Sequence, residues 1–191
     1  MSAALRAAAG PRFDVGLEPL GFEHAAAMQE LLAGPAVAGP LRLPHPLPPR
    51  HVEREVVALR HHEREGTRAS FAIVVARWVA QAAGQAAAPG GAPVVAGGCD
   101  LCAIDRHGRT AEIRYWLGEP FWGRGIGRAA VSALLGEARA RGLGSVTTFI
   151  APGNLRSRRL AEALGFERMS RSDAEEAPGG APPLLAYGRA L

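Results

Sequence analysis

The chain has 191 residues, of which 48% are hydrophobic and 21% charged, and its formal net charge is +4. This length fits one domain with a single core, and we expect that domain over 12–191, after a flexible tail over 1–11. No apolar run is long enough to cross a bilayer, and the first residues lack the apolar core of a signal peptide. These patterns predict a cytoplasmic protein with no membrane partner.

The basic residues are all arginine, and lysine does not occur in the sequence. Together with the frequent Ala, Gly and Pro, this usage is typical of a GC-rich genome, so we expect a bacterial source. The arginines alternate with acidic residues, as in HVEREVVALRHHEREGTR (51–68). They form no basic stripe with interleaved aromatic residues, which argues against nucleic acid as a partner.

In the first third of the chain, the sequence predicts one strand followed by two helices. RFDVGLEPL (12–20) alternates as a strand does, whereas 23–33 and 51–66 carry apolar residues at helical spacing. Gly66 is the expected end of the second helix. The prolines of 34–50 exclude a regular helix there and predict an extended loop.

Three strands are expected next. The segments 70–79, 92–104 and 110–118 are rich in β-forming residues. The low-complexity segment AQAAGQAAAPGG (80–91) separates the first two, and we expect it to be an exposed hairpin extension.

The remaining third alternates helices and strands. We expect a helix over 125–142, a strand over 145–150, a helix over 154–165 and two last strands within 166–172 and 184–191. This order predicts an α/β fold on one sheet, antiparallel where strands follow each other directly. The unit 110–150 should be a parallel crossover.

The two cysteines lie in CDLC, as Cys99 and Cys102. A C-x-x-C pair suggests a metal or redox site when a second ligand pair or a helix start accompanies it. Here the pair lies in a predicted strand, where residues three apart point to opposite faces. We therefore expect no disulfide and no metal site.

Three glycines, Gly123, Gly125 and Gly127, lie where a helix should begin, in EPFWGRGIGRAAVSALL (119–135). A strand, a glycine turn and a helix start together favour anion binding, because the first-turn N–H groups lack helical partners and glycine lets a phosphate approach. No G-K-[ST] follows, which excludes a P-loop. The next strand ends in APGN without a carboxylate, which excludes a dinucleotide site.

The segment AEIRYWLGEPFWGRGIGRAAVSALL (111–135) resembles the acetyl-CoA-binding segment of the GNAT N-acetyltransferases, above all the branch of the ribosomal-protein alanine N-acetyltransferases. NLRSRRLAEALGF (154–166) is similar to the family's second motif, and the two occur in the family's order. The resemblance implies a mixed, mostly antiparallel sheet that splays at the cofactor site, flanked by about four helices. It also implies acetyl-CoA as co-substrate, without a metal.

The resemblance assigns cofactor contacts to three parts of the chain. It implies that Trp116 and Leu117 face the pantetheine arm, and that Asn154 positions the cofactor. It further implies that the pyrophosphate is cradled by the turn and the start of the helix, namely Trp122, Gly123, Arg124, Gly125, Ile126, Gly127 and Arg128.

Acyl transfer to an amine needs a base and a proton donor for the departing thiolate. Glu112, on the strand before the turn, is one candidate base, with a surface or ion-paired role as the alternative. The family's usual tyrosine donor is replaced by Ala161, and the resemblance makes Ser157 the substitute. An ordinary first-turn residue is the alternative for Ser157, and Asn154 is also a good N-cap.

We therefore expect an N-acetyltransferase that acts by direct attack of a primary amine on acetyl-CoA in a ternary complex. The acceptor is either a protein N-terminus or a small-molecule amine. A catalytically silent acyl-CoA-binding or sensing domain is the main alternative, and a structural protein without cofactor is a third. A homodimer stays an open alternative.

Overall fold

The computed structural model describes residues 5–8, 13–79, 88–169 and 183–191. Its strands form one sheet in the order β1-β2-β3-β4-β5-β6-β8-β7. They are β1 Leu5–Ala8, β2 Phe13–Pro19, β3 Ala69–Val79, β4 Ala88–Asp105, β5 Thr110–Leu117, β6 Ser145–Ile150, β7 Glu167–Arg168 and β8 Leu185–Ala190. The α-helices are α1 Ala25–Leu32, α2 Pro35–Ala38, α3 His51–Arg64, α4 Ile126–Ala140 and α5 Leu155–Ala163.

The sheet has the predicted mixed topology. Every ladder is antiparallel except that of β5 with β6, which is parallel and is connected through α4. The expected crossover over 110–150 is therefore confirmed. Because a parallel connection must return over the face of the sheet, it places the start of α4 beside the end of β5.

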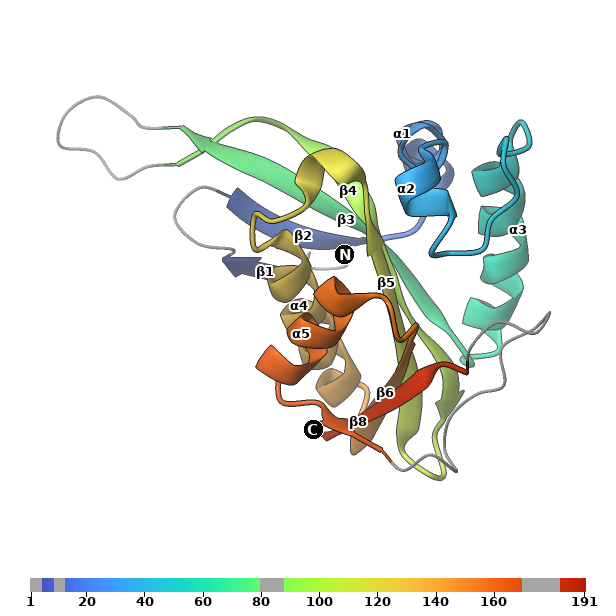
Figure 1. Cartoon of the computed structure of the whole chain (residues 1–191), viewed down its shortest axis with the longest axis vertical. Coiled ribbons are helices and arrows are strands. Elements are labelled where there is room, and N and C mark those ends of the chain that lie inside the picture. The colour runs from blue at the N-terminus through green and yellow to red at the C-terminus, as the bar shows by residue number, and fades with distance from the viewer. Residues whose placement is uncertain (1–4, 9–12, 80–87, 170–182) are drawn as a thin grey trace, which may run out of the picture.

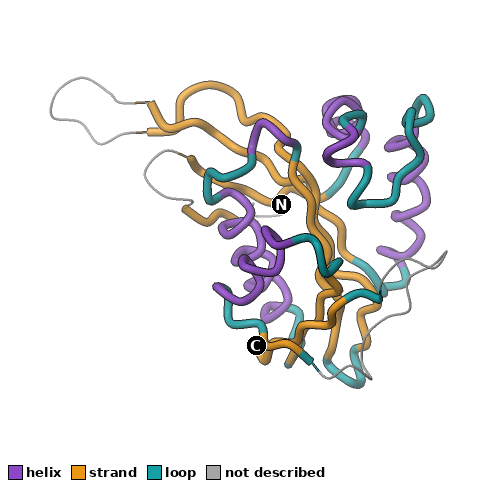
Figure 2. Tube along the Cα trace, viewed as in Figure 1, coloured by secondary structure: helices purple, strands orange, loops and turns teal. Residues whose placement is uncertain are grey.

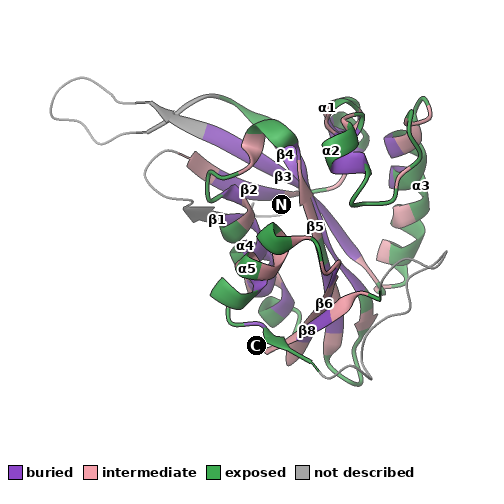
Figure 3. Cartoon of the chain, viewed as in Figure 1, coloured by how far each residue is buried: buried purple, intermediate pink, exposed green. Residues whose placement is uncertain are grey.

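Helices cover both faces of the sheet (Figures 1 and 2). On one face, α4 and α5 enclose the larger core, to which Ile126, Leu134 and Ile113 contribute. On the other face, α1, α2 and α3 pack through Met28, Val56 and neighbouring residues. Buried residues accordingly follow the sheet, whereas the outer helix surfaces are exposed (Figure 3). No helix within the described ranges is long and apolar enough to span a membrane.

Helix α4 is fixed by its apolar stripe. Ile126, Ala130 and Leu134 recur every four residues and are fully buried, as the period of an amphipathic helix requires. Full burial of a leucine side chain contributes about 2 kcal/mol. The stripe therefore holds the first turn of α4, and the glycines before it, in a defined place against the sheet.

Two short elements differ from the sequence expectation. Leu5–Ala8, expected within a flexible tail, form the edge strand β1 against β2, because an exposed sheet edge offers hydrogen bonds that local propensity does not reveal. Within the proline-rich segment, Pro35 begins the short helix α2. Proline is tolerated at that first helical position, where no N–H partner is lost. The described residues therefore form five α-helices, where about four were expected.

Two expectations lie partly outside the described residues. The antiparallel ladder of β3 with β4 reaches the pair Val79 and Ala88, whereas most of the hairpin expected at 80–91, residues 80–87, lies outside the described residues. Likewise β7 ends at Arg168, and the rest of the strand expected over 166–172 falls largely in the undescribed range 170–182.

Cys99 and Cys102 are free, buried thiols on β4. Burial raises the pKa of Cys99 far above its usual range and that of Cys102 to about 12. Because the thiolate is the reactive form, we expect neither cysteine to react with a chromogenic disulfide reagent at pH 8 in the native protein, and both to react in denaturant. Rapid reaction of the native protein would contradict this arrangement.

Candidate active site

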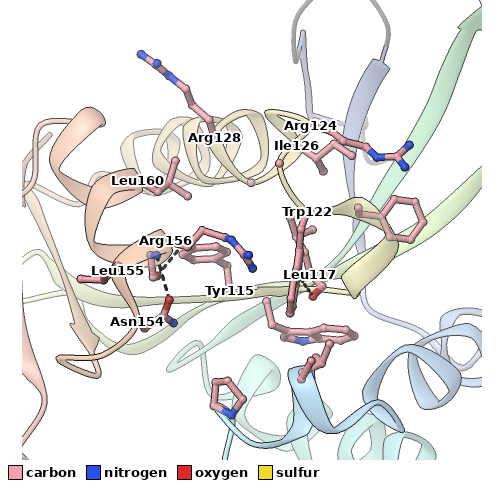
Figure 4. A pocket seen from close by; sticks show the side chains of 18 of the residues that line it. Tyr115, Leu117, Trp122, Arg124, Ile126, Arg128, Asn154, Leu155, Arg156 and Leu160 are labelled. Atoms are coloured by element: carbon pink, nitrogen blue, oxygen red, sulfur yellow. Dashed lines mark hydrogen bonds between the residues drawn. The ribbon is translucent and has the colours of Figure 1, made fainter.

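The parallel ladder of β5 with β6 is short. It pairs only Thr110, Ala111 and Glu112 with β6, so that the last five residues of β5 diverge from the neighbouring strand. The cavity that opens there has a volume of about 700 Å³. It is lined by Ala36, Val37, Pro40 and Leu41, by residues 115–117, by 121–128, and by Ala151, 153–157 and Leu160. The splay expected from the sequence is therefore present, and Figure 4 shows the side chains around it.

Two of the three glycines are required by the backbone. Gly123 has φ 72° and Gly125, the N-cap of α4, has φ 78°, a left-handed conformation that a Cβ atom disfavours. Gly127 is helical, and a Cβ atom there would make ordinary contacts with Leu160 at 3.4 Å and Leu117 at 3.5 Å. The turn is thus shaped mainly by its first two glycines.

The start of α4 has the features of an anion site. Gly125 makes no side-chain cap, and the first N–H groups of a helix have no partner within it. The helix dipole adds partial positive charge at the same end. Arg124 and Arg128 are exposed and line the cavity. These groups fit a pyrophosphate, which carries negative charge and accepts several hydrogen bonds.

Trp122 connects the glycine turn to its surroundings. Its indole Nε1 donates a hydrogen bond of 2.8 Å to the carbonyl oxygen of Leu117. The guanidinium of Arg156 lies 4.2 Å from the centre of the Trp122 ring and reaches toward it from α5 (Figure 4). Cation–π contacts of this kind stabilise by roughly 0.5–2 kcal/mol. Arg156 was not predicted as a site residue, although it lies within the second motif.

Trp116 and Leu117 leave β5 on opposite faces. Trp116 packs with the core on the α1–α3 side, and Leu117 with the core on the α4–α5 side. Both line the cavity, because it surrounds the end of the strand. The N–H of Gly118 bonds to Ala96 on β4. Since successive N–H groups of a strand alternate in direction, the N–H of Leu117 points into the splay, where it can donate to a carbonyl.

The first turn of α5 forms the opposite wall. Asn154 is its N-cap, and the Asn154 side-chain oxygen accepts the backbone N–H of Ser157 at 3.1 Å. The Ser157 hydroxyl oxygen lies 2.8 Å from the hydroxyl oxygen of Tyr115 on β5. Tyr115 was missed by the sequence analysis, because its partner lies 42 residues later in the chain.

We expect Asn154→Ala to lower the free energy of unfolding by about 1 kcal/mol, because the N-cap hydrogen bond is lost. Asn154→Asp should retain the wild-type stability, since a carboxylate also caps a helix and interacts favourably with its dipole. Chemical denaturation of the two variants measures this difference. Equal stability of Asn154→Ala and wild type would show that the cap contributes nothing.

Glu112 lies apart from the other predicted residues. All of them except Glu112 line the cavity. Arg114 donates to the two Glu112 carboxylate oxygens, at 2.6 Å from Nε and 3.0 Å from Nη2. The hydrogen bond to Glu112 raises the pKa of Arg114 above its usual range. The structure thus displays the ion pair that was the alternative for Glu112, and kinetics of a Glu112 variant are needed to test the role as base.

Comparison with solved structures finds the same fold. The ribosomal L7/L12 α-N-protein acetyltransferase RimL, in complex with coenzyme A, is 20% identical over 97% of this chain and 98% of its own, with a TM-score of 0.73. Mycobacterium smegmatis RimJ, in complex with CoA-disulfide, is 21% identical over 99% and 86%, with a TM-score of 0.72. The acetyltransferase MccE, in complex with acetyl-CoA and AMP, is 19% identical over 93% and 92%, with a TM-score of 0.69.

Sequence comparison identifies the family. No curated protein sequence matches the chain. The sequence model of the acetyltransferase (GNAT) domain, however, matches residues 14–167, a range that contains β3 to β6, the glycine turn and α5. The resemblance of the two motifs to this family is therefore confirmed, and the chain belongs to the GNAT acetyltransferase family.

Proposed function

We propose that this chain transfers the acetyl group of acetyl-CoA to the α-amine of a protein N-terminus. Acetyl transfer is the activity of the family to which the chain belongs. The observation that carries the proposal is the glycine turn at the start of α4, which opens on the splay of β5 from β6 in one cavity with Ser157.

The described residues offer groups for three parts of the co-substrate, namely its pyrophosphate, its pantetheine arm and its thioester. Bound acetyl-CoA supplies the acetyl thioester. The turn over 122–128 would hold the pyrophosphate, and the edge of β5 at Leu117 would bind the pantetheine arm and donate to the thioester carbonyl. Ser157 would provide the proton for the departing thiolate from the start of α5, where the helix dipole also favours negative charge.

The charges around the cavity favour an acceptor with a single amine. The charged residues among its described lining are Arg124, Arg128 and Arg156, and none of that lining is acidic. A polyamine or an aminoglycoside brings several positive charges, and the described lining offers no carboxylate to pair with them. A peptide N-terminus needs to bring only the amine that reacts, and RimL, which shares the fold, acetylates such an amine according to its name.

The pKa of the acceptor gives a second reason. An α-amine has a pKa of about 8, whereas a lysine side chain has one of about 10.4. At neutral pH the neutral, nucleophilic fraction of the α-amine is therefore about 200 times larger. An α-amine thus needs little help from a base to lose its proton. This suits a cavity whose described lining contains no carboxylate that could act as one.

Substitution of Glu112 distinguishes a role as catalytic base from a role in the ion pair with Arg114. Glu112→Gln should lower kcat by about 100-fold and change the acidic limb of the pH–rate profile if Glu112 is the base. We expect less than a threefold change, because Arg114 occupies both carboxylate oxygens. Arg114→Ala is the second variant of this test, since it removes the guanidinium that binds the Glu112 carboxylate and keeps the carboxylate itself.

Thiol release from acetyl-CoA, measured with a panel of amines at pH 7.5, tests the proposal. We expect peptides with a free N-terminus to react about 100-fold faster than the same peptides with a blocked N-terminus and one lysine, and faster than a polyamine. Preferential reaction of the lysine or the polyamine would overturn the assignment of the acceptor. Binding of acetyl-CoA without release for any amine would favour a silent acyl-CoA-binding domain instead.

A further inference from the structure

Tyr115 is a cavity residue to which neither motif assigns a role. It lies on β5 between the ladder to β6 and the glycine turn. Its hydroxyl oxygen is 2.8 Å from that of Ser157, and both residues line the cavity. This hydrogen bond crosses from β5 to the first turn of α5, at the point where β5 and β6 have separated.

We propose that Tyr115 is a positioning residue for acetyl transfer, which holds the Ser157 hydroxyl toward the departing sulfur and resupplies its proton. The proposal rests on the function proposed above. When the bond between the acetyl carbon and the sulfur breaks, its electron pair stays on the sulfur. Ser157 gives its proton to the sulfur, Tyr115 gives its proton to the Ser157 oxygen, and solvent returns a proton to Tyr115. The acetyl carbon is by then bonded to the amine nitrogen, and that nitrogen gives its surplus proton to solvent to leave the amide.

The position of Ser157 is fixed from two sides. Its backbone N–H donates to the Asn154 side chain at 3.1 Å, and its hydroxyl bonds to Tyr115. A serine hydroxyl otherwise rotates freely among several directions. Either hydroxyl can donate in this bond. In the proposed arrangement the Tyr115 O–H donates to the Ser157 oxygen, which leaves the serine hydrogen free to point into the cavity that both residues line.

The surroundings of Tyr115 suit a proton donor. Burial raises the pKa of Tyr115, while the hydrogen bond to Ser157 and the charge of Arg156 oppose this change. The phenol therefore keeps its proton at neutral pH, and the two opposing groups are placed to stabilise the anion when the proton has left. On α5 itself, Ala161 lies one turn after Ser157 and has no proton to give. The strand thus provides the phenol that the helix lacks.

Kinetics of single and double variants test this role. Tyr115→Phe should lower kcat by about 10- to 100-fold with the KM for acetyl-CoA nearly unchanged. Tyr115→Phe combined with Ser157→Ala should be no slower than Ser157→Ala alone, because both residues act in one step.

Tyr187→Phe is the matched control. It is the only other tyrosine in the sequence, it is buried and bonded to Arg158 and Glu162, and it lies outside the cavity lining.

A wild-type kcat in Tyr115→Phe, or effects that multiply in the double variant, would overturn the role of Tyr115 alone. Absence of thiol release by the wild-type chain with every amine would overturn the proposed function together with that role. The two failures are therefore distinct.

A second readout does not need turnover. In Tyr187→Phe protein labelled with ¹³C at the tyrosine ring carbon that bears the hydroxyl, Tyr115 gives the only such signal. We expect Ser157→Ala to shift this signal and to raise the pH at which it titrates, because a hydrogen bond that lowers the pKa is lost. A signal that does not respond to Ser157→Ala would overturn the proposal.

Discussion

Gly125→Ala should weaken acetyl-CoA binding by at least about tenfold, equivalent to roughly 1.4 kcal/mol. Gly125 is the N-cap of α4 with φ 78°, and it lines the cavity where the first-turn N–H groups are exposed. A Cβ atom there obstructs the approach of a phosphate and strains the left-handed backbone by about 1–2 kcal/mol. Isothermal titration calorimetry measures the loss of affinity directly.

Gly142→Ala is the matched control for this prediction. Gly142 also has φ 78° and follows the other end of α4, and a Cβ atom added to it would meet nothing within 4 Å. Both variants should therefore lose similar stability from backbone strain, whereas only Gly125→Ala should lose affinity. Equal affinity of the two variants for acetyl-CoA would contradict the assignment of the glycine turn as the pyrophosphate site.

Ser157→Ala should lower kcat by about 100-fold, a typical contribution of a positioned proton donor. Its affinity for acetyl-CoA should change little, because the backbone N–H that Asn154 accepts remains in place. Alanine also fits the first turn of a helix, so that α5 should keep its fold. Steady-state kinetics with calorimetry on the same protein separate the effect on kcat from the effect on binding.

Ser132→Ala controls for the loss of a serine hydroxyl. Ser132 is exposed on α4 and does not line the cavity, so its replacement should leave kcat at the wild-type value. A Ser157→Ala enzyme that keeps at least a third of the wild-type kcat would show that Ser157 is an ordinary first-turn residue.

The sequence predicts best what local patterns determine. The stripe of Ile126, Ala130 and Leu134 identifies α4, and the glycines before it identify the turn, because helix periodicity and left-handed backbone both leave a signature within a few residues. The parallel crossover follows from the order of the elements, because a helix between two strands requires it. For this reason the sequence predicted that the residues of the glycine turn lie together, and they do line one cavity.

The contacts that cross the cavity were not predicted. The hydrogen bond of Tyr115 with Ser157 and the contact of Arg156 with Trp122 join residues far apart in the chain. No pattern within a few residues of the sequence indicates which of these distant residues are in contact. Such pairs depend on where β5 and β6 separate, which is a property of the whole sheet.

The partner of Glu112 in its ion pair did have a signal in the sequence. Glu112 and Arg114 are two residues apart on a strand, and residues at that spacing share a face. Opposite charges in this arrangement favour the ion pair that the structure displays. Alternation along β5 would also have placed Tyr115, rather than Trp116, on the side of α5.

The most direct test of the account is the calorimetric titration of the wild-type chain with acetyl-CoA and with S-acetylpantetheine, which lacks the nucleotide and the pyrophosphate. We predict one site for acetyl-CoA, with a Kd between about 1 μM and 1 mM, the usual range for an enzyme's substrate. S-acetylpantetheine should bind at least about tenfold more weakly, a difference in binding free energy of roughly 1.4 kcal/mol. No binding of acetyl-CoA, or equal affinity for the two compounds, would contradict the claim that the glycine turn at the start of α4 is a pyrophosphate site.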